Sequence, residues 1–155
     1  MVAPILPLAA FKGETPGEDV EVAVHDMPAG CSVDDLRRHW HSRSRLVVPL
    51  LPSPTDIRVA VRFLMQLNRD ELLSRPGVVA LIANRVRTNT TYFKVLMSFL
   101  EQVNLPVLTH IRDSQNYVRA MERGLGLFDL PSNRVAQDCE QWQPLLRWLD
   151  FESAA

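Results

Sequence analysis

Residues 77–103 of the chain read GVVALIANRVRTNTTYFKVLMSFLEQV and contain one complete strand-and-helix unit. The apolar run at residues 78–83 has no polar alternation, which is typical of a strand buried on both faces of a parallel sheet. The run ends at Asn84-Arg85, and residues 88–91 then offer helix caps. The helix that follows is expected to bury side chains at i, i+3, i+4 and i+7: Leu96, Phe99, Leu100 and Val103.

The same succession recurs on both sides of this unit. Apolar runs at residues 20–26, 46–51 and 106–111 are each followed by a stretch with helical periodicity. Four strand-then-helix units in series predict an α/β fold: a parallel sheet with right-handed crossovers and helices on both faces. A last helix, capped by Ser132, is expected to have one buried face: Val135, Cys139, Trp142, Leu146 and Leu149.

Two of the predicted helices carry start signals. Ser32 followed by Asp35 has the spacing of a capping box. Ser53 can cap the helix after the second run, because Pro54 suits the first helical position and Asp56 faces the positive end of the helix.

The composition indicates one ordinary globular domain. The chain has 155 residues, 17 Lys+Arg, 18 Asp+Glu and a formal net charge of −1. This length can bury a sizeable core. We expect an irregular Pro- and Gly-rich lead-in at residues 1–19, the domain at residues 20–150 and a short tail at residues 151–155.

Charge and cysteine content limit the class of function. The balanced charge excludes a nucleic-acid binder that works by bulk attraction, but it leaves a local basic patch open. Cys31 and Cys139 fit neither a disulfide framework nor a metal-binding spacing, which favours a reducing compartment. The apolar N-terminal residues are too few to span a bilayer. We therefore expect a cytoplasmic protein without membrane contact.

Ligands of parallel sheets bind outside the carboxyl ends of the strands. The carboxyl ends of the predicted strands therefore form the candidate site. That rule selects four places in this chain: Asp26, residues 52–56, Asn84-Arg85 and Arg112-Asp113.

Asp26 follows a hydrophobic strand pattern and precedes Pro-Ala-Gly, which is the form of a Walker B strand. A carboxylate at a rigid strand end supplies the hard oxygen that Mg²⁺ on a nucleotide phosphate requires. The alternative is that Asp26 only caps the turn. The chain contains no G-x-x-x-x-G-K-[ST] phosphate loop, and residues 11–17 lead into a strand pattern instead of a helix.

Several strings occur in a fixed order along residues 20–150. They are VHDMPAG at 24–30, VPLLPSPTD at 48–56, IANRV at 82–86, and IRDSQNY at 111–117 running on to GLGLF at 124–128. With this order and spacing, the chain resembles the C-terminal two-thirds of the ParA/MinD-type partitioning ATPases, which have a deviant Walker A loop. It most resembles the ParA-like branch of chromosome or plasmid partitioning.

The resemblance implies specific roles. Asp26 would be the catalytic Walker B aspartate and a Mg²⁺ ligand, Asn84 would read the adenine edge, and Arg112 and Asp113 would flank the base. The intact family member binds ATP and Mg²⁺ between two subunits, hydrolyses ATP slowly and binds DNA nonspecifically as the ATP-bound homodimer. A ParB-like partner stimulates that hydrolysis.

The chain departs from the family at its start. The family's first strand, its K-G-G-x-x-K-[ST] loop, the following helix and the switch aspartate should precede residue 1. We therefore expect an incomplete or degenerate P-loop NTPase-like domain that lacks the phosphate-loop unit and is inactive alone. A non-enzymatic pseudo-ATPase that binds a partner is the alternative. A flavodoxin-like receiver domain is disfavoured because no acidic cluster follows the first strand pattern.

Two groups of basic residues are candidates for contacts with DNA phosphates. Arg85, Arg87 and Lys94 follow the third apolar run. Arg119 and Arg123 are four residues apart and can face one side of a helix. The alternative is that these side chains are solvated or pair with acidic neighbours.

Overall fold

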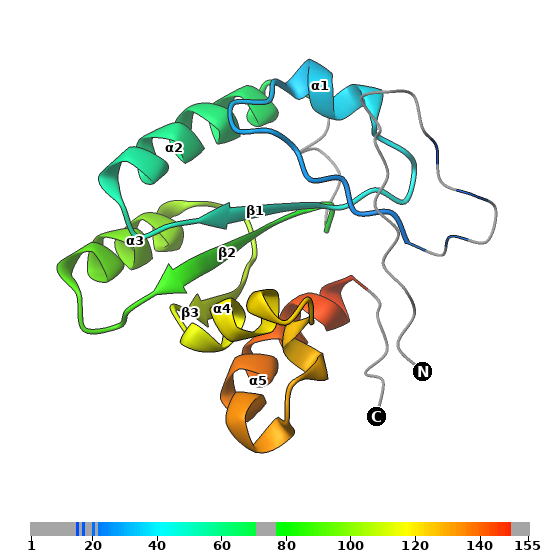
Figure 1. The fold of residues 1–155 in the computed structure, drawn as a ribbon. Coiled ribbons are helices and arrows are strands. Elements are labelled where there is room, and N and C mark those ends of the chain that lie inside the picture. Colours follow the sequence, from blue (N-terminus) through cyan, green and yellow to red (C-terminus); the bar gives the residue numbers. More distant parts are fainter. Residues whose placement is uncertain (1–14, 16, 18–19, 21, 71–76, 150–155) are drawn as a thin grey trace. The chain divides into compact units, whose positions relative to one another are not determined.

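The computed structural model describes residues 15, 17, 20, 22–70 and 77–149. The chain divides into two compact units, Met1–His39 and Trp40–Ala155. The smaller unit contains one described helix, α1 (Val33–Arg38), and the larger unit contains the other described helices and all the described strands (Figure 1).

The larger unit is an α/β fold with a three-stranded parallel sheet, in the order β1-β2-β3, flanked by helices. The strands are β1 (Leu46–Leu50), β2 (Val79–Val86) and β3 (Val107–Arg112). The connecting helices are α2 (Pro54–Asn68) and α3 (Thr91–Gln102). After β3 come α4 (Gln115–Glu122), the short 3-10 helix η3 (Leu127–Asp129) and α5 (Ser132–Trp148). The predicted α/β class and parallel sheet are therefore confirmed.

The central strand β2 is buried on both faces. Ala80 and Ile82 point to one side of the sheet and Val79, Leu81 and Ala83 to the other, because side chains alternate along a strand. None of these five is more than 5% exposed. This two-sided burial is the reason for the uninterrupted apolar run in the sequence.

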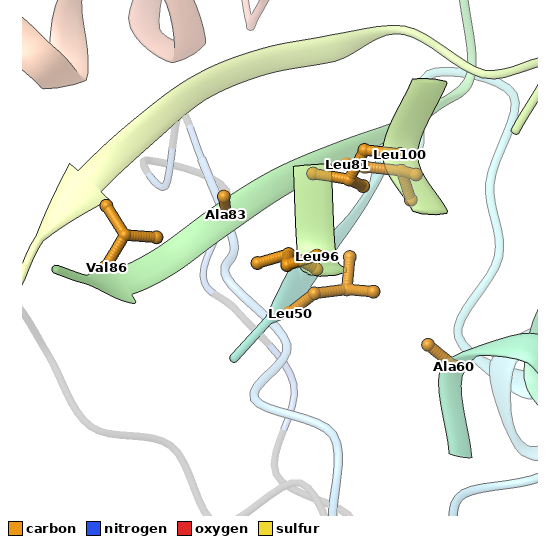
Figure 2. Packing of buried hydrophobic residues seen from close by; sticks show 7 residues of the cluster. All are labelled: Leu50, Ala60, Leu81, Ala83, Val86, Leu96 and Leu100. Carbon is orange, nitrogen blue, oxygen red and sulfur yellow. The ribbon is translucent and has the colours of Figure 1, made fainter. Parts of the chain in front are cut away.

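Leu81 and Ala83 belong to a core cluster that joins the sheet to two helices. Each fully buried leucine in it contributes about 1.5–3 kcal/mol through the hydrophobic effect. Because α2 and α3 both supply residues to the cluster, the two helices cover the same face of the sheet. Figure 2 shows the other members: Leu50 of β1, Ala60 of α2, Val86 of β2, and Leu96 and Leu100 of α3.

A second cluster holds α4, η3 and α5 together. Its buried members are Ala120, Leu127, Leu130 and Val135. Tyr117 and Trp142 pack against it, and the Trp142 Nε1–H group donates a hydrogen bond of 2.9 Å to the Tyr117 hydroxyl.

The predicted helix starts are confirmed at two places and wrong at a third. Ser32 and Asp35 form a reciprocal capping box, and Ser53 caps α2 with Pro54 in its first turn. Ser132, predicted as a cap, is instead the first residue of α5. The preceding residue, Pro131, takes the cap position and makes no side-chain cap hydrogen bond. Proline at this position already directs the chain into the helix, so the serine lies one position too late to cap it.

The predicted strand at residues 20–26 is wrong. Residue 20 and residues 22–26 are assigned to no strand, and the described sheet has three strands instead of four. Val24 is 89% exposed. A strand requires a neighbour for its backbone groups, and valine-rich composition expresses only a preference for that conformation.

The tail predicted at residues 151–155 and nearly all of the lead-in at residues 1–19 lie outside the described residues. No helix in the part of the chain that the structure describes is long and apolar enough to cross a membrane.

Candidate functional site

The end of β2 carries an irregularity at Asn84 and Arg85. The register between β2 and β3 shifts between Ala83 and Val86, and Arg85 has a φ of 50°. The left-handed backbone costs an L-residue about 1–2 kcal/mol. The Asn84 Oδ1 atom accepts a hydrogen bond of 3.0 Å from the Arg85 N–H group, which supports this conformation. Such irregularities redirect side chains and are frequent beside functional sites.

The redirected Arg85 side chain meets Asp113, which directly follows β3. The Arg85 Nε–H group lies 3.4 Å from Asp113 Oδ1, while Arg87 donates from Nε and NH2 to Oδ2 at 3.0 and 2.6 Å. The Asp113 N–H group also donates to the Val86 carbonyl at 3.0 Å, which anchors this residue to the end of β2.

The two arginines set the charge state of Asp113. The hydrogen bond from Arg87 is the largest cause that lowers the pKa of this carboxyl, and the positive charges of Arg87 and Arg85 add to it. The side chains of Arg85 and Arg87 are 69% and 71% exposed, against 22% for Asp113. Solvent screening at that exposure limits each pair to about 0–1 kcal/mol of stability.

Arg112, the last residue of β3, points into a buried network. Its Nε and NH2 atoms donate to the two carboxylate oxygens of Asp138, the second at 3.1 Å, and its NH1 atom donates to Gln137 Oε1 at 2.6 Å. Asp138 also accepts hydrogen bonds from Ser114 Oγ at 3.1 Å and from Asn116 Nδ2 at 2.6 Å. The network therefore joins β3, α4 and α5.

Asp138 is completely buried and ionised. Burial raises the pKa of its carboxyl, but the hydrogen bonds from Arg112, Asn116 and Ser114 outweigh that effect and lower the pKa below its ordinary value. Among the described residues no buried side-chain nitrogen or oxygen lacks a hydrogen-bond partner. The network thus meets the condition under which a buried charge is tolerated.

A hollow of about 820 Å³ lies beside these residues. It runs from the ends of β2 and β3 along the outer edge of β3, with α5 as its other wall. Gln141 of α5 closes part of that edge, because its Oε1 atom accepts the Arg112 N–H group at 3.0 Å and its carbonyl accepts the Thr109 hydroxyl at 2.6 Å. The volume of the hollow is that of a small-molecule site. The polar groups facing it include Arg87, Asn89, Asp113, Gln137 and Gln141.

The structure brings together four of the predicted site residues: Arg85, Arg87, Arg112 and Asp113. Three of them line the hollow, whereas Arg85 contacts it only through Asp113. Asn84 adjoins them in the sequence but does not line the hollow. The roles of Asn84, Arg112 and Asp113 in binding a base stay predictions.

The remaining predicted residues lie elsewhere. Asp26 is an exposed residue of the smaller unit, and its catalytic and Mg²⁺-binding roles stay predictions. Within the residues that the structure describes, no group of three or more His, Cys, Asp and Glu side chains could hold a metal ion. Lys94 is exposed on α3, and Arg119 and Arg123 are exposed on α4 and just after it.

Asp138, Gln137 and Gln141 were missed from the sequence. One signal for Asp138 was present: it lies three residues after Val135, on the face of α5 that was expected to be buried. An acidic residue at such a position is almost never buried without a partner, so a basic partner could have been expected. Nothing local identifies that partner as Arg112.

Comparisons of the chain with protein-family models, with curated proteins and with solved structures found no match. The resemblance to the partitioning ATPases rests on the sequence strings alone.

Proposed function

We propose that the chain belongs to a ParA-like ATPase of chromosome or plasmid partitioning, and that the hollow beside β3 is its base-binding edge. The observation that carries the proposal is the position of this hollow. It opens at the carboxyl ends of β2 and β3, where parallel sheets bind ligands, and Arg112 and Asp113 border it.

The residues at this edge would have different roles. Asp113 and Asn89 would present polar groups to the base. Arg112 would act as a positioning residue, because Asp138 and Gln137 already hold its guanidinium. The Asn84 side chain would reach the adenine edge only after releasing the Arg85 N–H group.

The residues around the hollow would not bind the phosphates of the nucleotide. The 155 residues contain no phosphate loop, and such loops supply most phosphate contacts in this class. We therefore propose weak nucleoside binding and no ATP hydrolysis by this chain alone. In the intact cytoplasmic protein, ATP and Mg²⁺ would support a homodimer that binds DNA nonspecifically and responds to a ParB-like partner.

Titration of the ¹⁵N-labelled chain with millimolar adenosine tests the base-binding edge. Amide shift changes should concentrate at residues 84–89 and 112–113, and guanosine at the same concentration should cause smaller ones. The Asp113→Asn variant should weaken the response, while Asp129→Asn, at a residue that does not line the hollow, should not. Equal responses to both nucleosides, or none at these residues, would contradict the proposal.

A non-enzymatic interaction module is the second candidate. The observation that favours it is that the charged groups at this edge already satisfy each other, as Arg85 and Arg87 pair with Asp113, and Arg112 pairs with Asp138. A K-G-G-x-x-K-[ST] coding stretch directly upstream in the genome would favour the ATPase. Adenosine-independent capture of a protein partner by the chain, lost in a variant of the β3 edge, would favour the module.

A further inference from the structure

The outer edge of β3 is suited to pairing with a further strand, both by its position and by its sequence. In the part of the chain that the structure describes, β2 is its neighbour on one side and no strand lies on the other. A row of its backbone N–H and C=O groups therefore faces away from the sheet. Residues 107–111 read VLTHI and contain no Lys, Arg, Asp, Glu or Pro. Natural edge strands often carry such residues, because charge and proline prevent pairing with a strand of another molecule.

The opposite edge of the three-stranded sheet has this protection. β1 contains Pro49, which has no N–H group, and proline within a sheet is confined mainly to edge strands. Both β1 and β3 pair with β2 on their inner side. Of the two edges, β3 is thus the one that needs another means to prevent pairing.

Gln141 of α5 supplies hydrogen-bonding groups where a fourth strand would lie. The Asp113 N–H group donates to the Val86 carbonyl of β2, so the preceding N–H group, that of Arg112, faces outward. It donates to Gln141 Oε1 at 3.0 Å, the usual distance of a hydrogen bond in a sheet. The Thr109 hydroxyl donates to the Gln141 main-chain carbonyl at 2.6 Å. One residue of α5 therefore covers the edge at both Thr109 and Arg112.

The hydrogen bonds between α5 and β3 come from two sources. One is Gln141, and the other is the guanidinium of Arg112, which bonds Gln137 and Asp138 one turn earlier on α5. The second core cluster joins α5 to α4 and η3, and none of its members belongs to β3. The contacts of Gln141 are therefore the bonds that hold α5 over the middle of the edge, while Arg112 holds only its end.

We infer that Gln141 guards the outer edge of β3 against the β3 strand of a second copy of this chain. A second copy is the partner expected once the guard is removed, because two identical edges can pair antiparallel about a two-fold axis. Residues 107–111 carry no charge that would oppose this pairing. Val107 and Leu108 line the hollow, so part of the edge beside the guard is already uncovered.

The test is the oligomeric state of the chain without nucleotide, measured by sedimentation velocity over a wide range of protein concentration. The test variant is Thr109→Val/Gln141→Ala, which removes both contacts and introduces no charge. The wild type should remain monomeric, and the variant should dimerise as its concentration rises. The matched control, Thr55→Val/Gln66→Ala, makes the same changes at exposed positions of α2 and should remain monomeric.

Hydrogen exchange locates the effect on the strand. In dilute solution the Arg112 amide should exchange about two- to tenfold faster in the single variant Gln141→Ala than in the wild type, which is the factor expected for the loss of one hydrogen bond. At concentrations where the double variant dimerises, the amides of residues 107–111 should exchange more slowly than in its monomer. Should the double variant fail to fold by circular dichroism, dimerisation and Arg112 exchange in Gln141→Ala decide the question.

A charge on the edge strand distinguishes edge pairing from a general loss of stability. Leu108→Lys added to the double variant should restore the monomer, because a lysine on an edge strand opposes pairing. A monomeric double variant, equal dimerisation of the wild type or the control, or dimerisation that persists after Leu108→Lys would overturn the inference. Because no nucleotide is present, failure of adenosine binding leaves these outcomes unaffected.

Discussion

Arg112 donates two hydrogen bonds to the fully buried carboxylate of Asp138, which lies 26 positions away along the chain. This pair holds the end of β3 against α5. It also orients Arg112, which directly precedes Asp113. The polar hollow and the network around Asp138 thus share two residues, Arg112 and Gln137. Asp138 does not line the hollow, but a substitution there should alter the position of Arg112, which does.

Asp138→Asn should lower the free energy of unfolding by about 3–5 kcal/mol, because removing one charge of a buried pair leaves the other without its partner. The partial exposure of Arg112 keeps the loss toward the lower end of that range. Urea denaturation measures it. Glu140→Gln, on an exposed position of the same helix, is the control and should change stability by less than about 0.5 kcal/mol. Equal values for the two variants would show that the network does not stabilise the fold.

The same carboxylate predicts a dependence of stability on acid. Its pKa in the folded chain is below the ordinary value of 3.8, so its contribution is present above that pH and is lost as the pH falls through the folded pKa. The unfolding free energy of the wild type should therefore fall more between about pH 5 and pH 3 than that of Asp138→Asn. Parallel pH profiles would contradict the assignment. Asp113 titrates in the same direction in both proteins and cancels in the comparison.

Arg87→Gln should raise the pKa of Asp113, because the hydrogen bond from Arg87 is the largest cause that holds this pKa down. Arg85→Gln should raise it less, since its single contact is 3.4 Å long. Carboxyl ¹³C shifts followed against pH measure both changes. Neither variant should lose more than about 1 kcal/mol of stability. A larger pKa change in Arg85→Gln would reverse the order of the two contacts.

The isolated chain should show no micromolar binding of Mg-ATP by calorimetry, because its 155 residues contain no phosphate loop. Asp26→Asn should leave the thermal melting of the chain unchanged, since Asp26 is exposed. In a protein that includes a phosphate loop, the same variant should remove Mg²⁺-dependent hydrolysis. Tight binding of Mg-ATP that disappears in Lys12→Gln would show that residues 11–17 act as a phosphate loop after all.

The local features of the fold could be predicted from the sequence. The apolar runs at residues 46–51, 78–83 and 106–111 correctly predicted β1, β2 and β3. The run of β2 is uninterrupted because residues 79–83 are buried on both faces of the sheet, whereas β1 and β3 are mostly half-buried. The caps at Ser32 and Ser53 could be identified because each serine side chain accepts a hydrogen bond from a backbone N–H group only three residues away. Both signals lie within a few residues of the structure that they specify.

The tertiary structure decided the rest. Residues 22–26 have a valine-rich pattern but no strand, because a strand depends on backbone partners that the segment itself does not carry. The sequence did not identify the counter-charge of Arg112 either. Asp138 meets Arg112 only after α4, η3 and α5 fold back onto β3. The sequence by itself determined which residues prefer to be buried, extended or helical. Which charges meet depended on packing between distant segments.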